Sequence, residues 1–446
     1  MKIVLIGAGS SVFTQGLIAD FIQLKEEFEP LEIALVDIDQ KALDSITNLS
    51  KKMISSKGAN IKITSYLNRR KALPEADVVV TTVAVGGRRA WENDVLIPRK
   101  YGIYQPVGDT TMPGGISRAQ RMIPVMLDIA RDVKEICPNA YFFNYSNPMT
   151  AICEAIKKSL DINVIGLCHG FIHVENYLAK FLEVPKSQLS ALGVGINHLT
   201  YMYDIRVNGI DAKEMLNDKL QKQKYNSDNL QKDDGDLNYR DNPFSWSIYE
   251  KFGVFPAVLD RHVVEFFPER FATGDYHGKK LGVNAFSFEA VISDGDRTYE
   301  EMHEIANGTR ELNYDLFDRT EGEHEQLVDI LRSLYRNDRK IFSVNMKNNG
   351  AVSNLPNHAV LELPAVASGR GFIPLHITDF PDMIASIVRK RLSVIDLTVE
   401  AALTGNFSLF VEALLADGSI RTEATAINLA NDLLQSHRKY LPQYFK

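Results

Sequence analysis

The sequence contains few cysteines, no excess of positive charge and no long apolar run. Its three cysteines, Cys137, Cys153 and Cys168, are an odd and sparse set that does not predict a disulfide framework. The net charge of −7 gives no general footprint for binding nucleic acid or an anionic membrane. No apolar run approaches the ~20 residues of a membrane span, and the N-terminus enters a strand-like run without a segment typical of an export signal. We therefore expect a globular cytoplasmic protein with no nucleic-acid or membrane partner.

Residues 1–195 alternate short β-branched runs with longer amphipathic runs. The strand-like runs are Lys2–Ile6, Glu32–Val36, Ile61–Thr64, Asp77–Val83, Ala140–Asn144 and Val164–Cys168, and the helix-like runs include Gln15–Glu27, Gln40–Ser56 and Ser117–Ile136. Such alternation predicts an α/β fold in which helices cover both faces of a doubly wound parallel sheet.

Beyond residue 195 the apolar spacing becomes mainly helical, notably over 379–403 and 422–434. We expect some strands just past this boundary and predict a mixed α+β domain over residues 196–446 for substrate binding and oligomerisation. Residues 221–241 are polar and lack periodicity, which predicts a mobile loop or lid.

Two glycines follow the first strand-like run in the sequence Gly7-Ala-Gly-Ser10. Glycines at this place allow a tight turn and let backbone N–H groups approach a pyrophosphate at a helix N-terminus. Val12 stands where the usual fingerprint has a third glycine, but Asp37 ends the second strand-like run with a carboxylate. A carboxylate there accepts hydrogen bonds from a ribose and repels a 2′-phosphate, so the pattern predicts a Rossmann domain, at residues 1–195, that binds NAD. An ordinary strand–helix turn and a surface acid are the alternatives.

Four polar segments follow strand ends: 108–115, 144–149, 168–169 and 195–198. Ligands of a doubly wound sheet bind outside the carboxyl ends of its strands, so these segments can converge. Cys168 and His198 are a soft and a borderline ligand that suit a transition metal with open positions for substrate. The alternatives are a buried cysteine and a loop histidine, or a Cys–His nucleophile pair, for which no acyl-transfer signature is present.

Several motifs in order resemble those of glycoside hydrolase family 4. They are Gly7-Ala-Gly-Ser10, the Pro-Gly-Gly of residues 113–115, Asn144-Tyr-Ser-Asn-Pro148, Cys168-His169 and Asn197-His198. The resemblance implies a fold similar to lactate and malate dehydrogenases. It also implies NAD and Mn²⁺ as cofactors. Enzymes of this family are an exception to the usual glycoside hydrolysis by a pair of carboxylates.

The resemblance implies a redox-neutral hydrolysis. NAD⁺ takes a hydride from sugar C3, the resulting ketone acidifies the C2 proton, and the metal holds O2 and O3. Loss of that proton expels the glycosidic oxygen, water adds at C1, and the bound NADH restores C3.

Carried over residue by residue, the resemblance makes Cys168 and His198 the metal ligands and Asn147 a ligand of the sugar hydroxyls. His169 stands where some relatives have an acid, so it is predicted to act as general acid or to orient substrate. Asp260 is the predicted C2 base, with Tyr249 as the second choice. A role for Asp260 as a helix cap or as a paired surface carboxylate is the alternative.

The substrate prediction depends on the segment 88–102 and on Gly170. Trp91 stands where phospho-glycosidases of the family have a phosphate-binding arginine. Its indole offers an apolar face for a sugar ring but cannot neutralise a 6-phosphate, so Trp91 is predicted to bind a sugar without that group. Arg88 and Arg89 suit a carboxylate instead, unless they are solvated loop residues, and Gly170 leaves room beside Cys168-His169. The resemblance is greatest to α-galacturonidases, which would fit pectin degradation, with α-galactosidase or α-glucosidase as the alternative. Relatives form dimers or tetramers, so we expect a homo-oligomer.

Two rival interpretations stay open from the sequence. A 2-hydroxy acid dehydrogenase would use the same Rossmann domain and would accumulate NADH with its product. An NAD-sensing binding protein would retain the fold without catalysis.

Overall fold

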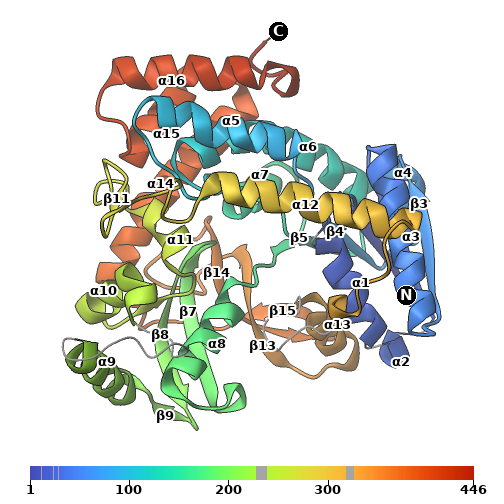
Figure 1. Cartoon of the computed structure of the whole chain (residues 1–446), viewed down its shortest axis with the longest axis horizontal. Helices are drawn as coiled ribbons and strands as arrows, with labels where there is room; N and C mark the ends of the chain where they lie inside the picture. The colour runs from blue at the N-terminus through green and yellow to red at the C-terminus, as the bar shows by residue number, and fades with distance from the viewer. Residues whose placement is uncertain (12, 24, 29, 228–238, 318–325, 446) are drawn as a thin grey trace.

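The computed structural model describes residues 1–446 except 12, 24, 29, 228–238, 318–325 and 446 (Figure 1). Its N-terminal part is a parallel sheet in the order β3-β2-β1-β4-β5-β6. These strands are β1 (Lys2–Ile6), β2 (Leu31–Val36), β3 (Ile61–Tyr66), β4 (Val78–Thr81), β5 (Tyr141–Asn144) and β6 (Val164–Gly166). This order is that of dinucleotide-binding Rossmann domains, so the predicted fold class is confirmed.

Helices cover both faces of the parallel sheet. One face carries α1 (Phe13–Gln23) and α3 (Gln40–Ser56), and the other carries α6 (Met112–Ile136) and α7 (Met149–Leu160). In β1, Ile3 and Leu5 join the core on the first face, whereas Val4 and Ile6 join the core on the second. Because both faces are buried, the strands are continuous apolar runs rather than alternating ones.

An antiparallel part continues the same sheet. It contains β7 (Leu189–Ile196), β8 (Leu199–Val207), β10 (Phe255–Pro256), β13 (Lys340–Lys347), β14 (Val360–Ser368) and β15 (Gly371–Pro374). Strand β13 pairs with β6 through Asn345 and Gly166, and it also pairs with β14 along its whole length. One sheet therefore runs across both predicted domains, and the predicted boundary near residue 195 lies within β7.

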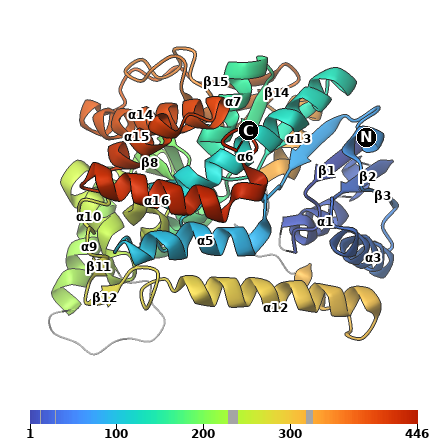
Figure 2. The same cartoon turned by 90° about the horizontal axis from the view of Figure 1, so that it is seen from above.

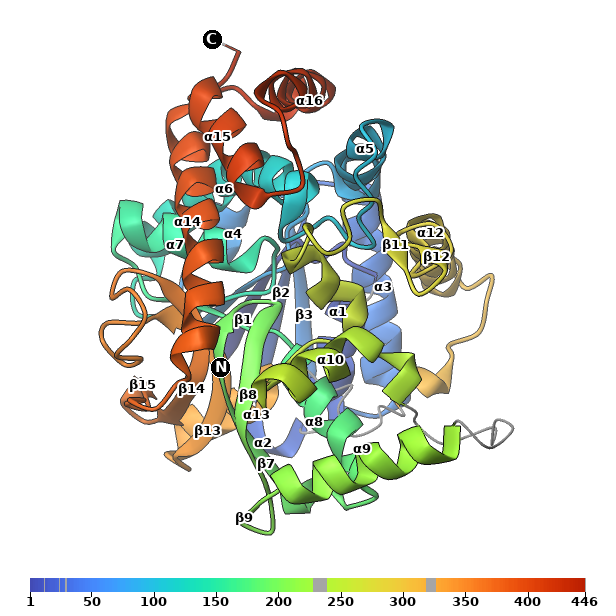
Figure 3. The ribbon, with the colours of Figure 1, turned by 90° about the vertical axis from the view of Figure 1, so that its left-hand side faces the viewer.

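The remaining helices surround this sheet (Figures 2 and 3). They are α5 (Gly87–Lys100), α8 (Gly170–Leu182), α9 (Lys213–Ser227), α10 (Pro243–Phe252), α11 (Asp260–Val263), α12 (Phe288–Asn307), α13 (Gln326–Arg336), α14 (Asp382–Thr404), α15 (Phe407–Asp417) and α16 (Glu423–Ser436), with the short α2 (Lys25–Phe28) and α4 (Arg69–Ala72) and the small strands β9 (Ile210–Asp211), β11 (Asp275–Tyr276) and β12 (Lys279–Lys280). The helical spacing predicted over 379–403 and 422–434 is confirmed by α14 and α16.

Some predicted boundaries were wrong. Residues 221–227 belong to α9 instead of a loop, residues 228–238 of that prediction lie outside the described residues, and residues 239–241 form a 3₁₀ turn. Strand β6 ends at Gly166, so Cys168 and His169 lie in the connection to α8. Among the described residues, no helix combines the length and apolarity needed to cross a membrane.

Candidate active site

The glycine turn and the acidic residue of the predicted NAD site lie together. The backbone N–H groups of Gly7 and Ala8 donate to Val36 O at 2.9 and 3.0 Å, and Gly9 N–H donates to Asp37 Oδ2 at 2.8 Å. A Cβ on Gly9 would lie 2.8 Å from the same carboxylate oxygen, so only glycine permits this approach. The turn continues to Ser10, whose N–H donates to Gly7 O at 3.3 Å. The geometry fits the pyrophosphate and ribose of a dinucleotide.

Replacing Asp37 with alanine should weaken the discrimination between NAD⁺ and NADP⁺, because the carboxylate that repels a 2′-phosphate is lost. Isothermal titration should show a smaller ratio of the two dissociation constants. Asp44→Ala, which removes an exposed carboxylate from the following helix α3, is the matched control. An unchanged ratio in the Asp37 variant would show that this residue is not the ribose ligand.

Asp109, His198 and His262 form a group that can hold a metal ion, because their ligand atoms all lie within 4.8 Å of one another. Asp109 precedes α6, His262 lies in α11, and His198 lies in the two-residue turn between β7 and β8 with φ of 65°. The rings of His198 and His262 have centroids 4.5 Å apart. The carboxylate is a ligand that suits Mn²⁺, and the two imidazoles are ligands typical of divalent transition ions.

Thr110 fixes the orientation of His198. Its hydroxyl donates to Asp109 Oδ1 at 2.8 Å and lies 2.9 Å from His198 Nδ1. A hydroxyl has one proton to donate, so Thr110 accepts the Nδ1–H of His198, which leaves the Nε2 lone pair for a metal. Gly115 allows this loop to pack against α6, because a Cβ there would lie 2.3 Å from the Thr110 carbonyl carbon.

The group has the protonation states that a metal requires. Burial lowers the pKa of His198, and burial together with the charge of His198 lowers the pKa of His262 well below its usual range. Burial acts to raise the pKa of Asp109, but attraction to His198 and Arg118 outweighs it and the pKa is lowered. Neutral imidazoles beside an ionised carboxylate are metal-ligand forms.

Asn147 and Arg118 lie beside this group. Asn147 Nδ2 donates to Asp109 Oδ2 at 3.0 Å, while the buried Asn147 Oδ1 has no hydrogen-bond partner among the described residues. Arg118 Nε donates to Asn147 O at 3.0 Å, and the arginine is only 9% exposed. Among the described residues, this Nε contact is the hydrogen bond of the guanidinium. Burial lowers the pKa of Arg118, while attraction to Asp109 opposes that shift.

Cys168 does not join the three-residue group. Its buried Sγ accepts the N–H of Gly170 at 3.4 Å, and its carbonyl oxygen accepts Gln326 Nε2 at 2.8 Å. His169 is exposed at the start of α8. Its charge contributes to lowering the pKa of His262, after burial and the charge of His198. The predicted pairing of Cys168 with His198 stays a prediction.

The room predicted beside Gly170 is occupied. A Cβ on Gly170 would lie 2.9 Å from Val258 Cγ1 and 3.1 Å from Ala257 O. The glycine therefore accommodates the chain before α11, and the predicted space for substrate at this point was wrong.

Asp260 has the contacts of a helix cap. It is fully buried and accepts hydrogen bonds from Phe244 N, Ser245 N and Ser245 Oγ at 2.8, 2.7 and 2.6 Å, and also from Tyr276 Oη. These donors occupy the carboxylate and satisfy the N-terminus of α10. The geometry favours the helix-cap alternative over the predicted C2 base. The second choice, Tyr249, donates to Asn217 Oδ1 at 3.1 Å and packs in a separate core cluster.

Trp91 and Arg89, both on α5, contact residues other than those of the metal group. Trp91 Nε1 donates to Val107 O at 2.7 Å and its ring packs against Phe288, which supports the loop carrying Asp109. Arg89 is exposed and pairs with Glu92 at 2.8 Å and with Asp296 on α12. These contacts give no support to their predicted roles in substrate binding.

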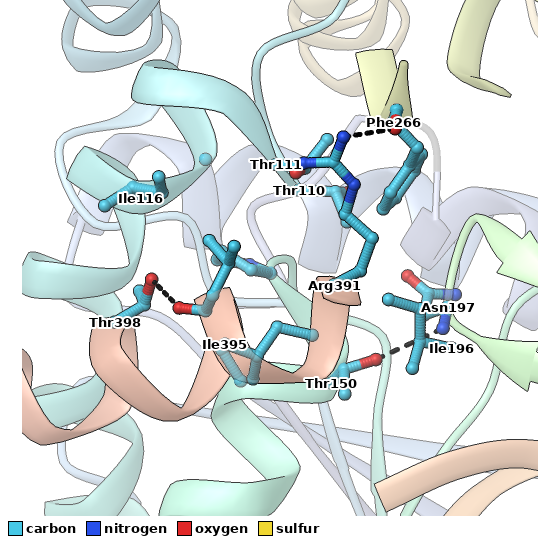
Figure 4. Close-up of a pocket in the computed structure, with 14 residues that line it drawn as sticks. Thr110, Thr111, Ile116, Thr150, Ile196, Asn197, Phe266, Arg391, Ile395 and Thr398 are labelled. Atoms are coloured by element: carbon cyan, nitrogen blue, oxygen red, sulfur yellow. Dashed lines mark hydrogen bonds between the residues drawn. The ribbon is translucent and has the colours of Figure 1, made fainter. Parts of the chain in front are cut away.

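A cavity of about 20 Å³ lies behind the hairpin turn that carries His198 (Figure 4). It is lined by Thr110, Thr150, Asn197 and Arg391, among others. This volume suits about one water molecule and is too small for a sugar ring, so the substrate does not bind there.

Both halves of the chain match family models. The model described as family 4 glycosyl hydrolase matches residues 2–184, and the one described as family 4 glycosyl hydrolase C-terminal domain matches residues 193–420. An alpha-galacturonidase of Thermoanaerobacterium saccharolyticum is 30% identical over 99% of this chain and 96% of its own length. An alpha-galactosidase of Bacillus subtilis is 28% identical over 99% of both chains.

Solved structures agree with these matches. A putative glucosidase, lplD, of Bacillus subtilis has a TM-score of 0.84 and 26% identity and covers 97% of this chain and 99% of its own. A 6-phospho-alpha-glucosidase from gut microorganisms, solved with NAD and Mn²⁺, has a TM-score of 0.83 and 18% identity, with 99% of both chains covered. A malate dehydrogenase of Cryptosporidium parvum, with a TM-score of 0.51 at 16% identity over 90% of this chain and 98% of its own, shares the fold. The chain belongs to the family 4 glycosyl hydrolases.

Proposed function

We propose that the protein hydrolyses α-galacturonides with NAD and Mn²⁺ as cofactors. The observation that carries the proposal is the buried guanidinium of Arg118 beside the Asp109–His198–His262 group. A site that combines metal ligands with a buried arginine, whose hydrogen bond to the described residues uses Nε and not the terminal nitrogens, suits a sugar that carries one negative charge.

The proposed roles follow from the contacts. His198 and Asp109 would hold the metal together with His262, and Cys168 would complete the ligand set predicted from the family resemblance. The cofactors would supply a hydride acceptor at sugar C3 and a Lewis acid for the oxygens at C2 and C3. Asn147 Oδ1, which has no hydrogen-bond partner among the described residues, would accept a hydrogen bond from a sugar hydroxyl.

Arg118 would bind the sugar carboxylate in place of Arg88 and Arg89, for which the sequence predicted this role. Its Nε is fixed on Asn147 O at 3.0 Å, so its terminal nitrogens are held in place before substrate arrives. A guanidinium fork matches a planar carboxylate with two parallel hydrogen bonds. A neutral galactoside or glucoside offers no charge to this fork. An α-galactosidase or α-glucosidase activity is therefore the second candidate function.

Replacing Arg118 with glutamine should lower kcat/KM on nitrophenyl α-galacturonide by about 10- to 100-fold, the cost of one charged hydrogen-bonding partner. The assay compares it with the matching α-galactoside and α-glucoside in NAD⁺, Mn²⁺ and a reducing agent. The kcat/KM of Arg118→Lys, which keeps the charge without the fork, should lie between those of the wild type and Arg118→Gln.

Two results would contradict this proposal. A wild-type preference for a neutral sugar would exclude the galacturonide. An equal loss on all three sugars would show that Arg118 contacts a group common to them. Thermal melting and NAD⁺ affinity of each variant control for misfolding.

The proposal extends to setting and assembly. A cytoplasmic location would keep Cys168 reduced, a galacturonide fits the breakdown of pectin fragments, and a homo-oligomer remains a prediction from the family resemblance. Net NADH accumulation with product would favour the dehydrogenase alternative, since the hydrolysis leaves the cofactor oxidised.

A further inference from the structure

Helix α12 belongs to the second half of the chain but lies against the NAD-binding half. Figure 2 shows it running beside α5 and reaching α3. Ser45 Oγ on α3 lies 2.6 Å from His303 Nδ1, and Lys52 Nζ donates to Ile305 O at 2.5 Å. The end of α12 is therefore attached to the helix that starts directly after Asp37.

The middle of α12 contacts the start of α5. Arg88 Nε donates to Asp296 Oδ1 at 2.6 Å, and the Arg88 guanidinium lies over the ring of Tyr299, 5.4 Å from its centroid. Arg88 follows β4 by a few residues, whereas Tyr299 lies one helical turn before His303. Tyr299 therefore lies between the contact of α12 with α5, through Asp296, and its contact with α3, through His303.

The adenosine half of a dinucleotide bound at this turn must occupy the same region. Asp37, at the end of β2, marks the ribose, and the adjacent Ile38 is 93% exposed. Burial raises the pKa of the Tyr299 hydroxyl, and the charges of Asp39 and Asp37 act in the same direction while Arg88 opposes them. Because α3 follows β2 and α5 follows β4, a helix anchored on both spans this region.

We propose that Tyr299 and Arg88 form the outer wall of the adenosine site, so that α12 covers the cofactor after it binds. The exposed Ile38 would contact one face of the adenine. The Tyr299–Arg88 pair would contact the ribose and the other face of the adenine. This inference rests on the proposed function only for the identity of the cofactor as NAD.

The wall matches what the reaction requires. The hydride leaves the sugar and returns to it, so a cofactor that dissociates in its reduced form ends the cycle. A helix anchored on α3 and α5 slows that dissociation at the adenosine end, away from the metal group.

Titration calorimetry on the full chain tests this inference. Tyr299→Ala should weaken NAD⁺ binding by about tenfold, as expected when an aromatic contact to a base is lost. ADP-ribose should lose affinity to the same extent, whereas nicotinamide mononucleotide should be unaffected. Tyr299→Phe should retain most of the affinity, and Glu300→Ala, an exposed neighbour on α12, is the control.

The outcomes separate the two proposals. Unchanged NAD⁺ and ADP-ribose affinity in a folded Tyr299→Ala variant would overturn the inference and leave the glycosidase proposal intact. Equal losses for ADP-ribose and nicotinamide mononucleotide would also overturn it, because the effect would not be local to adenosine. If the wild type binds no NAD⁺, the proposed function itself fails.

Discussion

Replacing His198 with alanine should lower turnover of an α-glycoside by more than about 100-fold, beyond the loss seen when a group that only orients a metal ligand is removed. His198 belongs both to the predicted pair with Cys168 and to the group with Asp109 and His262. Its loss therefore weakens the metal site in either ligand set. The measurements are nitrophenol release with NAD⁺ and Mn²⁺, and Mn²⁺ binding by electron paramagnetic resonance.

Two further variants identify the remaining ligands. Cys168→Ser should reduce Mn²⁺ affinity if the thiolate binds the ion, and His262→Ala should do so if the three-residue group does. Chelation of the wild type should abolish activity, and Mn²⁺ or a similar transition ion should restore it best. A His198→Ala enzyme that binds Mn²⁺ as tightly as the wild type would exclude both sets. NAD⁺ affinity should stay constant throughout.

Replacing Asp94 with alanine should destabilise the fold by about 3–5 kcal/mol, the usual cost of leaving one partner of a buried ion pair alone. Asp94 on α5 is fully buried and accepts from Arg121 Nη1 at 2.9 Å and also from Nη2. His437 Nε2, near the C-terminus, lies 2.9 Å from the same carboxylate. Burial acts to raise the pKa of Asp94, but Arg121 and His437 outweigh it and the pKa is lowered.

Urea denaturation compares this variant with two others. Asp128→Ala removes an exposed partner of Arg131 one turn away and should cost no more than about 1 kcal/mol. The double change Asp94→Leu with Arg121→Met should be less damaging than Asp94→Ala, since no buried charge is left unpaired. If Asp94→Ala lowers the free energy of unfolding as little as Asp128→Ala does, the buried Asp94–Arg121 ion pair does not stabilise the fold as predicted.

The parallel half of the fold was predictable because its signals are local. Each strand is an apolar run of the length that a doubly covered sheet requires, and Asp39 caps α3 by accepting from Ala42 N at 3.1 Å. Gly9 and Asp37 follow their strands directly, so their meeting was implied by strand order. The antiparallel continuation was less visible, because β13 and β14 pair with strands more than a hundred residues earlier.

The site was only partly predictable for the same reason. His198 was identified from its motif, but Asp109 and His262 come from a loop and a short helix far apart in the sequence. The convergence of segment 108–115, which carries Asp109, with segment 195–198 was expected, but nothing in the residues around His262 indicates that its side chain joins them. Asp260 has the opposite history: the family resemblance suggested a catalytic role, whereas its carboxylate is occupied by donors from Phe244, Ser245 and Tyr276. A buried acid shows its role only through its partners.

The pairing of β13 with β6 limits how members of this family can be recombined. A chimera joined at residue 195 would take the cofactor half, which ends with β6, from one parent. It would take β13, the strand that pairs with β6, from the other parent. A fragment ending there would expose the open edge of β6, which is a template for pairing between chains and hence for aggregation. Specificity exchanges between relatives should therefore move residues 340–368 together with the first half, and not with the rest of the second half.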